Sequence, residues 1–397
     1  MTLVVRNEVD IIEDNLRYHR AQGVDFFIAL DNGSTDGTVE ILERYKQAGI
    51  LTLLHRPGNM LTIQRKGTTE IARLAHEMGA DWVFHNDADE FWWPFADGNL
   101  KEAFERIPEH QGVVLIPRTE FIPRPDRPGS FAEQLTIRES RFRRPPKTAH
   151  RTHPSIKLWT AHPIDLWVKR EAPPRSGLVG KPSLRIEAAH KEDQELDLVL
   201  APEFPIGALH FPLRSFEQYR KKIAIADHNK MWERNEETRA LHDAYRSGRL
   251  EEVFANLLLD DEIVATGLRE GWLVEDTALR DYLRACPGGL EEGEAPPGAS
   301  AWPAERREAA LAELREDGMY VISRYMQTVA SKKRTRHLQA RKLKKLRARV
   351  KESRQELWAM ERRSRRLERR SRRLEKVEKS RWWRMRPRLP ARRRPGH

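Results

Sequence analysis

The chain has 397 residues, of which 39% are hydrophobic and 33% are charged, and its formal net charge is +12. This length suits one domain of roughly 250 residues with appendages. The single cysteine, Cys286, excludes an intrachain disulfide and a cysteine-rich zinc module. The sequence shows neither a signal peptide nor an apolar run long enough to span a membrane, and we therefore expect a cytoplasmic protein.

The positive charge is concentrated towards the C-terminus. Residues 331–397 contain 29 Lys or Arg and 6 Asp or Glu, a balance of +23, whereas residues 1–330 contain 43 and 54, a balance of −11. We call residues 331–397 the basic arm. Apolar residues recur three and four positions apart between 343 and 374, which predicts a long helix with a coiled-coil seam.

The first 120 residues alternate between the hydrophobic periods of strands and helices. Strands are predicted at 3–5, 24–30, 50–54, 81–84 and 112–117, and helices near 9–16, 39–45, 62–78 and 99–107. Strands that alternate with helices indicate a mostly parallel sheet covered on both faces, so the predicted fold class is α/β. Helical periodicity returns between 215 and 283.

The composition divides the chain into five predicted regions. They are an α/β domain (1–230), a helical extension (231–285), a Gly- and Pro-rich linker (286–303), a long basic helix that is a possible coiled coil (304–380) and a basic tail (381–397).

Polar clusters follow four of the predicted strands. They are RNE (6–8), DNGSTD (31–36), HRPGN (55–59) and HNDADE (85–90). In an open parallel sheet, ligands bind beyond the carboxyl ends of the strands, so these clusters predict an active site at that edge. Asp87 and Asp89 alternate on an extended segment and therefore point to the same side, where they can share one hard cation. Such a cation would neutralise a pyrophosphate group.

Other phosphate and metal motifs find little support in the sequence. The strand–helix junctions contain no dinucleotide or P-loop glycine pattern, and the HNDADE region lacks the glycine of an EF-hand. The H-x-x-H at His150 and His153 has no further zinc motif nearby, and His162 and His190 are other possible site residues.

The segment VVRNEVDIIEDNLRYHRAQGVDFFIALDNGSTDGT, followed by DWVFHNDADEF, resembles glycosyltransferase family 2. The resemblance covers about residues 1–230 and is strongest to the branch whose motif reads D-x-D-E-F. It implies a GT-A fold and a metal-dependent enzyme. Such an enzyme moves a sugar from a nucleotide-sugar donor to a hydroxyl of a glycan or lipid-linked acceptor, with inversion.

The resemblance also implies roles for individual residues. Glu8 and Asp31 would bind the nucleotide, Asp87 would reach the ribose or the cation, and Asp89 would ligate Mn²⁺ or Mg²⁺. His210, which opens the segment HFPLRSFEQYRKK, would be a further ligand, and an imidazole ligand favours Mn²⁺. Three basic residues that follow would bind phosphate oxygens: Arg214, Lys221 and Lys222.

An inverting transfer needs a general base that deprotonates the acceptor hydroxyl. The family usually supplies an acidic residue after the D-x-D motif, but no acidic pair occurs at that place here. The candidates are Glu120 and Asp165. Trp92 and Trp93 are expected in the core or at its rim, and stacking on an acceptor sugar is the alternative.

Two other functions remain open at this point. A nucleotidyltransferase would use a similar sheet and cation but would release pyrophosphate. A catalytically degenerate domain would serve as a platform for the basic arm. The arm itself, which ends in RWWRMRPR, favours an anionic membrane surface at the inner face. Homodimerisation through the heptads is the next alternative, and nucleic acid is the least favoured partner.

Overall fold

In the computed structural model, the structure describes residues 1–95, 98–108, 111–124, 129–154, 156–157, 167–168, 186–187, 195–200, 206–228, 236–286, 308–309, 311–314, 316–317 and 376. The chain divides into two compact units, Met1–Thr328 and Val329–His397. Nearly all described residues belong to the first unit. The predicted linker, long basic helix and tail therefore lie almost entirely outside the described residues.

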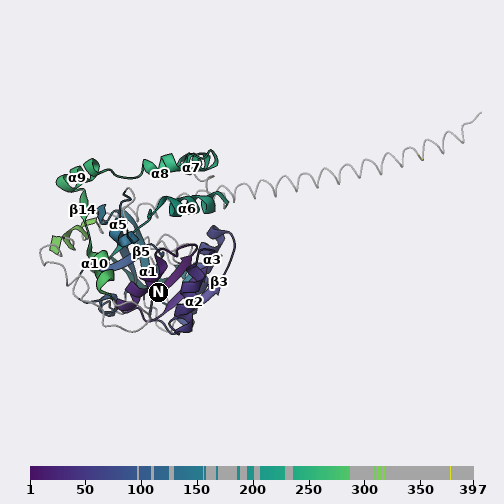
Figure 1. Ribbon diagram of the computed structural model, residues 1–397. Helices are drawn as coiled ribbons and strands as arrows, with labels where there is room; N and C mark the ends of the chain where they lie inside the picture. The colour runs from purple at the N-terminus through teal and green to yellow at the C-terminus, as the bar shows by residue number, and fades with distance from the viewer. Residues whose placement is uncertain are drawn as a thin grey trace, which may run out of the picture. The chain divides into compact units, whose positions relative to one another are not determined.

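Four parallel strands with three intervening helices form the first half of the sheet (Figure 1). The strands stand in the order β4-β1-β2-β3. Their bounds are β1 Thr2–Val5, β2 Phe27–Asp31, β3 Leu51–His55 and β4 Trp82–Asn86, and the helices are α1 Ile12–Ala21, α2 Thr38–Gln47 and α3 Met60–Glu77.

Both faces of this half-sheet are covered, because successive side chains of a strand point to opposite faces. Phe27 and Ala29 of β2 belong to the core cluster that includes α1 and α2. Ile28 and Leu30 belong to a second cluster that includes Ile71 of α3. The continuous apolar run of β2 is thus explained by burial on both sides.

The second half of the sheet is mixed. Strand β8 lies between β4 and β6 and is antiparallel to both, while β13 runs parallel to β6 and antiparallel to β5. The bounds are β5 Glu90–Pro94, α4 Leu100–Glu105, β6 Gln111–Glu120, α5 Phe131–Gln134, β7 Ile137–Glu139, β8 Arg144–Arg151, β9 Ile156–Lys157, β10 Trp167–Val168, β11 Ile186–Glu187, β12 Glu195–Leu200 and β13 Ile206–His210.

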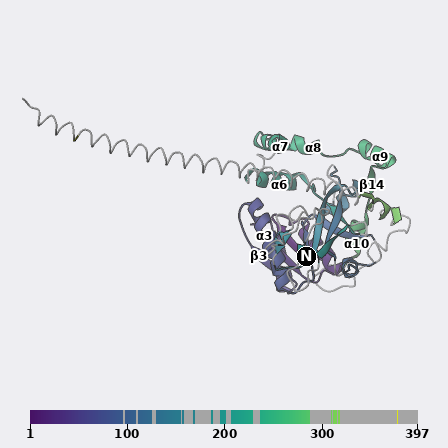
Figure 2. The same ribbon diagram turned by 180° about the vertical axis from the view of Figure 1, so that it is seen from behind.

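Helices follow the sheet. They are α6 Phe216–His228, α7 Glu236–Arg246, α8 Leu250–Ala255, α9 Asp261–Glu270 and α10 Ala278–Ala285, with β14 Leu273–Glu275 between the last two. Figures 1 and 2 both show α6, α7 and α8 as one group, which packs through Tyr219, Leu250 and Phe254. Tyr282 of α10 contacts the rings of Tyr18 and Trp93 and so joins the core of the sheet.

The predicted α/β fold class, with a mostly parallel sheet flanked by helices, is confirmed. The strand β5 was not predicted, since FWWP carries no alternation of polar and apolar residues. Trp92 and Trp93 are 0% and 2% exposed, so both are core residues and neither can stack on an acceptor sugar. None of the helices in the described part of the chain has the length and hydropathy needed to cross a bilayer.

Candidate functional site

The four polar clusters meet at the carboxyl edge of the parallel strands, as predicted. The backbone N–H of Asn7 donates to Ser34 Oγ at 3.0 Å, which joins the loops after β1 and β2. Asn32 Nδ2 donates to the carbonyl of Arg56 at 2.8 Å, which joins the loops after β2 and β3. Asn7 adopts φ = 57°, a left-handed conformation that asparagine tolerates better than most residues.

The turn that carries the two aspartates is fixed from α1. Asn15 Nδ2 donates to the carbonyls of Ala88 and Glu90 at 2.9 and 2.7 Å, and Asn15 is fully buried. The backbone N–H of Glu90 also donates to the carbonyl of Asp87 at 3.1 Å. The segment is therefore a rigid turn between β4 and β5 rather than a solvated loop.

Asp89 is buried among cations. Lys222 Nζ donates to its Oδ2 at 2.7 Å, Arg214 lies 3.5 Å from the same oxygen, and His210 Nε2 lies 3.6 Å from Oδ1. Burial by itself raises the pKa of the Asp89 carboxyl, but the charges of Lys222, His210 and Arg214 hold the pKa well below its ordinary range. Asp89 is therefore a carboxylate.

The strand register places His210. Because β13 lies between β5 and β6, His210 stands opposite Glu90 on one side and Glu120 on the other. His210 Nδ1 lies 3.2 Å from Glu120 Oε1, and Phe211 N donates to the carbonyl of Asp89 at 2.8 Å. Burial lowers the pKa of His210, but Asp89 and Glu120 outweigh it and raise the pKa above its ordinary value.

Glu120 is held by two partners besides His210. Arg144 lies 3.0 Å from Oε2, and Arg118 lies 3.9 Å from Oε1. Burial raises the pKa of Glu120, but His210 and the two arginines lower it below its ordinary value. The carboxylate thus orients the ring of His210, and a residue engaged in this way is poorly placed to collect a proton from an acceptor.

Asp87 and Glu90 share one buried lysine. Lys147 of β8 is 0% exposed, and its Nζ lies 2.7 Å from Asp87 Oδ2 and 2.8 Å from Glu90 Oε2. Arg118 donates to Glu90 Oε1 at 2.6 Å. Burial lowers the pKa of Lys147, but Asp87 and Glu90 outweigh it and raise the pKa. One oxygen of Asp87 is therefore already neutralised by a protein cation.

Arg214 is buried and bonds to several groups of the site, so it is not an exposed phosphate ligand. It donates to Glu8 Oε2 at 2.5 Å, to Asp10 Oδ2 at 2.7 Å and to the carbonyl of Phe211 at 3.2 Å. Burial raises the pKa of Glu8 to about 7 against the opposing charge of Arg214. Through these contacts the loop after β1 is tied to the segment that carries His210.

Asp31 shapes its own loop. Its carboxylate accepts from the backbone N–H groups of Gly33 and Ser34, both at 3.0 Å, and only 4% of the side chain is exposed. His55 Nδ1 lies 3.5 Å from Asp31 Oδ2 and is about half exposed. His55 therefore lies on the exposed side of the buried Asp31 carboxylate.

The remaining predicted residues lie elsewhere. Lys221 is exposed and lies 3.8 Å from Glu217, on its own helix. His150 is a buried partner of His85, with their Nε2 atoms 2.8 Å apart. The Nε2 atom of His150 is thus engaged by His85, which argues against His150 as a zinc ligand. His153 is also buried. Asp165, His162 and His190 lie outside the described residues.

The donor set at Asp89 and His210 suits a divalent cation held through two protein side chains. In the described ranges, no three His, Cys, Asp or Glu side chains gather closely enough to form a metal cage. Mg²⁺ and similar ions are commonly held by one or two carboxylates together with substrate phosphates, so two protein ligands suffice. Both aspartates contact a lysine at 2.7 Å, but Lys147 is fully buried between Asp87 and Glu90, whereas Lys222 at Asp89 is 36% exposed. Asp87 is therefore the less suitable of the two aspartates.

Sequence reasoning missed three residues that build the site: Asn15, Arg118 and Lys147. Each lies 28 or more residues along the chain from the residues of the D-x-D-E-F motif that it contacts, and none belongs to a local pattern. Glu90, in contrast, is the fourth letter of that motif, and its burial at 0% exposure shows why a carboxylate there needs two cations.

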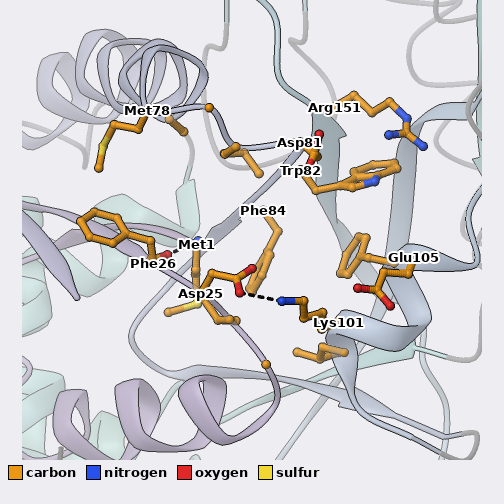
Figure 3. Close-up of a pocket in the computed structure, with 18 of the residues that line it drawn as sticks. Met1, Asp25, Phe26, Met78, Asp81, Trp82, Phe84, Lys101, Glu105 and Arg151 are labelled. Carbon is orange, nitrogen blue, oxygen red and sulfur yellow. Dashed lines mark hydrogen bonds and ion pairs between the residues drawn. The ribbon is translucent and has the colours of Figure 1, made fainter. Parts of the chain in front are cut away.

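A cavity of about 770 Å³ lies at the opposite edge of the sheet (Figure 3). It is lined by residues at the amino ends of the strands, such as Phe26 and Trp82. Lys101 pairs with Asp25 at 2.7 Å within it, and the guanidinium of Arg151 lies 4.8 Å from the centre of the Trp82 ring. The four polar clusters are all at the other edge, so we assign the candidate active site there.

Comparison with known families supports a transferase. Residues 3–181, slightly less than half of the chain, match the model of glycosyltransferase family 92. The match supports glycosyl transfer as the activity, and it is a match to family 92, whereas membership of the expected family 2 is not confirmed. No curated protein matches this chain.

Several solved structures of low similarity also match. S. aureus TarS 1-349 is 14% identical over 84% of this chain and 90% of that chain, with a TM-score of 0.31. TarS 1-349 in complex with UDP-GlcNAc is 21% identical over 32% of this chain and 36% of that chain, with a TM-score of 0.26. The mannosyltransferase PcManGT from Pyrobaculum calidifontis, in complex with GDP-Man and Mn²⁺, is 21% identical over 30% of this chain and 34% of that chain, with a TM-score of 0.23.

Proposed function

We propose that this glycosyltransferase transfers a sugar, with the help of a divalent cation, from a nucleoside diphosphate sugar to a hydroxyl of a glycan or lipid-linked acceptor. One observation carries the proposal. A carboxylate, an imidazole and a lysine ammonium, from Asp89, His210 and Lys222, meet beyond the carboxyl ends of the parallel strands. This combination suits a diphosphate and its cation.

Each part of the site has a place in this function. Asp31 and His55 lie beside each other at the carboxyl ends of β2 and β3, where they would contact the nucleoside. Asp87, whose side chain is 40% exposed, would accept a hydrogen bond from the ribose. Asp89 and His210 would hold Mn²⁺ or Mg²⁺, which stabilises the negative charge of the leaving diphosphate.

Inversion at the anomeric carbon and the identity of the base are further parts of the proposal. Glu120 orients His210, so we assign the base to an acidic residue elsewhere, with Asp165 as the candidate. For the acceptor and the location, we extend the proposal to an enzyme at the cytoplasmic face of a membrane. The charge balance of +23 in the basic arm supports adsorption to anionic lipid.

The test is a thermal-shift series with UDP, GDP, UDP-GlcNAc and GDP-Man, each with and without Mn²⁺. A ligand that binds only the native state raises its stability by about 2.7 kcal/mol at a hundred times its Kd. We expect at least one nucleotide to raise the melting temperature in a way that needs Mn²⁺. Absence of any shift across the series would contradict the proposal.

Product analysis separates this function from a nucleotidyltransferase. A glycosyltransferase releases a nucleoside diphosphate from its donor, even when water replaces the acceptor. A nucleotidyltransferase releases pyrophosphate. A chain that binds the nucleotide sugar without any turnover would match the degenerate platform.

A further inference from the structure

The contact between Lys222 and Asp89 has a consequence for the order in which the site fills. Lys222 Nζ lies 2.7 Å from Asp89 Oδ2 and donates to the carbonyl of Pro212 at 3.1 Å. Asp89 is one of the two residues that would hold the divalent cation. Lys222 therefore occupies an oxygen of the carboxylate that the cation needs.

Lys222 is the cation of this cluster that is able to move. Arg214, the other cation at Asp89 Oδ2, is 2% exposed and is fixed by Glu8 and Asp10. The side chain of Lys222 is 36% exposed and ends a flexible four-carbon stem. An ammonium group has three donors, and a contact with a diphosphate oxygen would replace the one it makes with Asp89.

The charges around Asp89 determine whether Lys222 or a divalent cation is the more stable partner of its carboxylate. A divalent cation that binds Asp89 alone must compete with Lys222 and lies close to Arg214 as well, so it is repelled by like charges. A diphosphate that binds together with the cation removes this competition, because its negative charge attracts Lys222 away from the Asp89 carboxylate. The two ligands then favour one another through a shared residue.

We propose that Lys222 blocks divalent-cation binding at Asp89 in the free protein and moves to the diphosphate when the nucleotide binds, so that the cation and the nucleotide bind together. This inference rests on the proposed function. It assigns Lys222 two successive partners, the first of which is the Asp89 carboxylate seen in the structure.

The decisive measurement is a titration of the full chain with Mn²⁺ alone, followed by the electron paramagnetic resonance signal of free Mn²⁺. Lys222→Gln should bind Mn²⁺ about tenfold or more tightly than the unmodified chain, because one competing charge at contact distance is removed. Adding Asp89→Asn to Lys222→Gln should abolish the gain, which locates it at this carboxylate.

Arg220→Gln is the matched control. It removes one positive charge from the same helix, where Arg220 pairs with Glu217 at 2.9 Å and not with Asp89. It should leave the affinity for Mn²⁺ unchanged. Circular dichroism verifies that each variant is folded.

The second half of the inference is tested by the affinity for UDP and GDP at saturating Mn²⁺. Lys222→Gln should weaken binding of the nucleotide that the chain prefers by about tenfold, the cost of one charge-assisted contact. The inference is overturned if Lys222→Gln binds Mn²⁺ no more tightly than the unmodified chain, if no variant shows Mn²⁺ binding that depends on Asp89, or if nucleotide affinity is unaffected.

The proposed function fails on a different result, namely an unmodified chain that binds neither UDP nor GDP in the presence of Mn²⁺. A chain that binds a nucleotide with Mn²⁺ but gives equal Mn²⁺ titrations for Lys222→Gln and Arg220→Gln retains the proposed function and loses only the inference.

Discussion

His210 Nδ1 lies 3.2 Å from Glu120 Oε1, while the opposite ring nitrogen faces Asp89 at 3.6 Å. The imidazole is thus held between two carboxylates, one from the strand beside it and one from the turn between β4 and β5. A carboxylate on the far nitrogen of a metal-binding histidine fixes the orientation of the ring and raises its basicity. Glu120 is consequently a positioning residue for His210.

Glu120→Gln should weaken Mn²⁺ binding in the presence of nucleotide by about 10- to 100-fold, the usual effect of losing such a partner. The reason is that a neutral amide holds the ring less firmly than a carboxylate. The control is Glu139→Gln, because Glu139 pairs with Arg144 at 2.5 Å on the same side of the site but has no described contact with His210. Equal losses in both variants would show that Glu120 acts only through Arg144.

Asp89→Asn should abolish the Mn²⁺-dependent part of nucleotide stabilisation, about 2.7 kcal/mol at a hundred times Kd, because an amide lacks the charge that a hard cation needs. The measurement is the melting temperature with the preferred nucleotide, with and without Mn²⁺. Asp87→Asn should retain the dependence on Mn²⁺, since the lysine at Asp87, Lys147, is fully buried and also bound to Glu90, unlike the partly exposed Lys222 at Asp89. If Asp87→Asn loses the dependence on Mn²⁺ and Asp89→Asn retains it, the cation ligand is Asp87 and not Asp89.

His210→Ala should likewise reduce Mn²⁺-supported turnover far more than His153→Ala. Both histidines are largely buried, so the comparison separates a ligand from a core histidine. The expected loss of turnover for His210→Ala is about 10- to 100-fold or more. Removing a direct ligand should weaken metal binding at least as much as removing the residue that orients it. Equal losses would assign His210 a structural role alone.

Lys147→Met should lower the free energy of unfolding by about 3–5 kcal/mol, because it leaves Asp87 and the fully buried Glu90 short of a cation. Lys46→Met, at an exposed lysine that pairs with Glu43 at 3.0 Å, should cost less than about 1 kcal/mol. Urea unfolding at neutral pH measures both. A small effect at Lys147 would mean that Arg118 suffices for Glu90.

Stability should fall with acid in a way that depends on His19. Burial lowers the pKa of His19 from 6.5 to about 3. Between these values the unfolded chain binds a proton that the folded chain does not, so the free energy of unfolding falls as pH falls, by about 1.4 kcal/mol per pH unit. His19→Gln should remove that share of the slope between pH 6 and about 4, whereas His55→Gln, at an exposed histidine, serves as the control. An unchanged slope would contradict a neutral buried His19.

Removal of residues 331–397 should leave nucleotide binding intact and abolish salt-sensitive adsorption to anionic vesicles. Roughly 1 kcal/mol per Lys or Arg near an anionic leaflet makes a segment of this charge sufficient for adsorption. Sedimentation with vesicles at low and high salt measures it. If the full chain ignores such vesicles and the truncation instead converts a dimer to a monomer, the arm is an assembly segment.

The sequence alone determined the first half of the sheet and the location of the site. Burial on both faces requires apolar strands such as Phe27–Asp31, and the helices between them show their own period, so the βαβ order was readable. The parallel arrangement then required the clusters around Asn7, Asp31, His55 and Asp89 to meet at one edge.

The tertiary structure alone decided what each side chain of the site contacts. Strand β5 and the position of β13 between β5 and β6 bring His210 to Glu120 across 90 residues of chain. No local period encodes such a register. Lys147 and Asn15 likewise reach the aspartate turn from distant elements. The like charges of the motif required cations nearby, but only the packing of β8 and α6 supplied the buried Lys147 and the partly exposed Lys222.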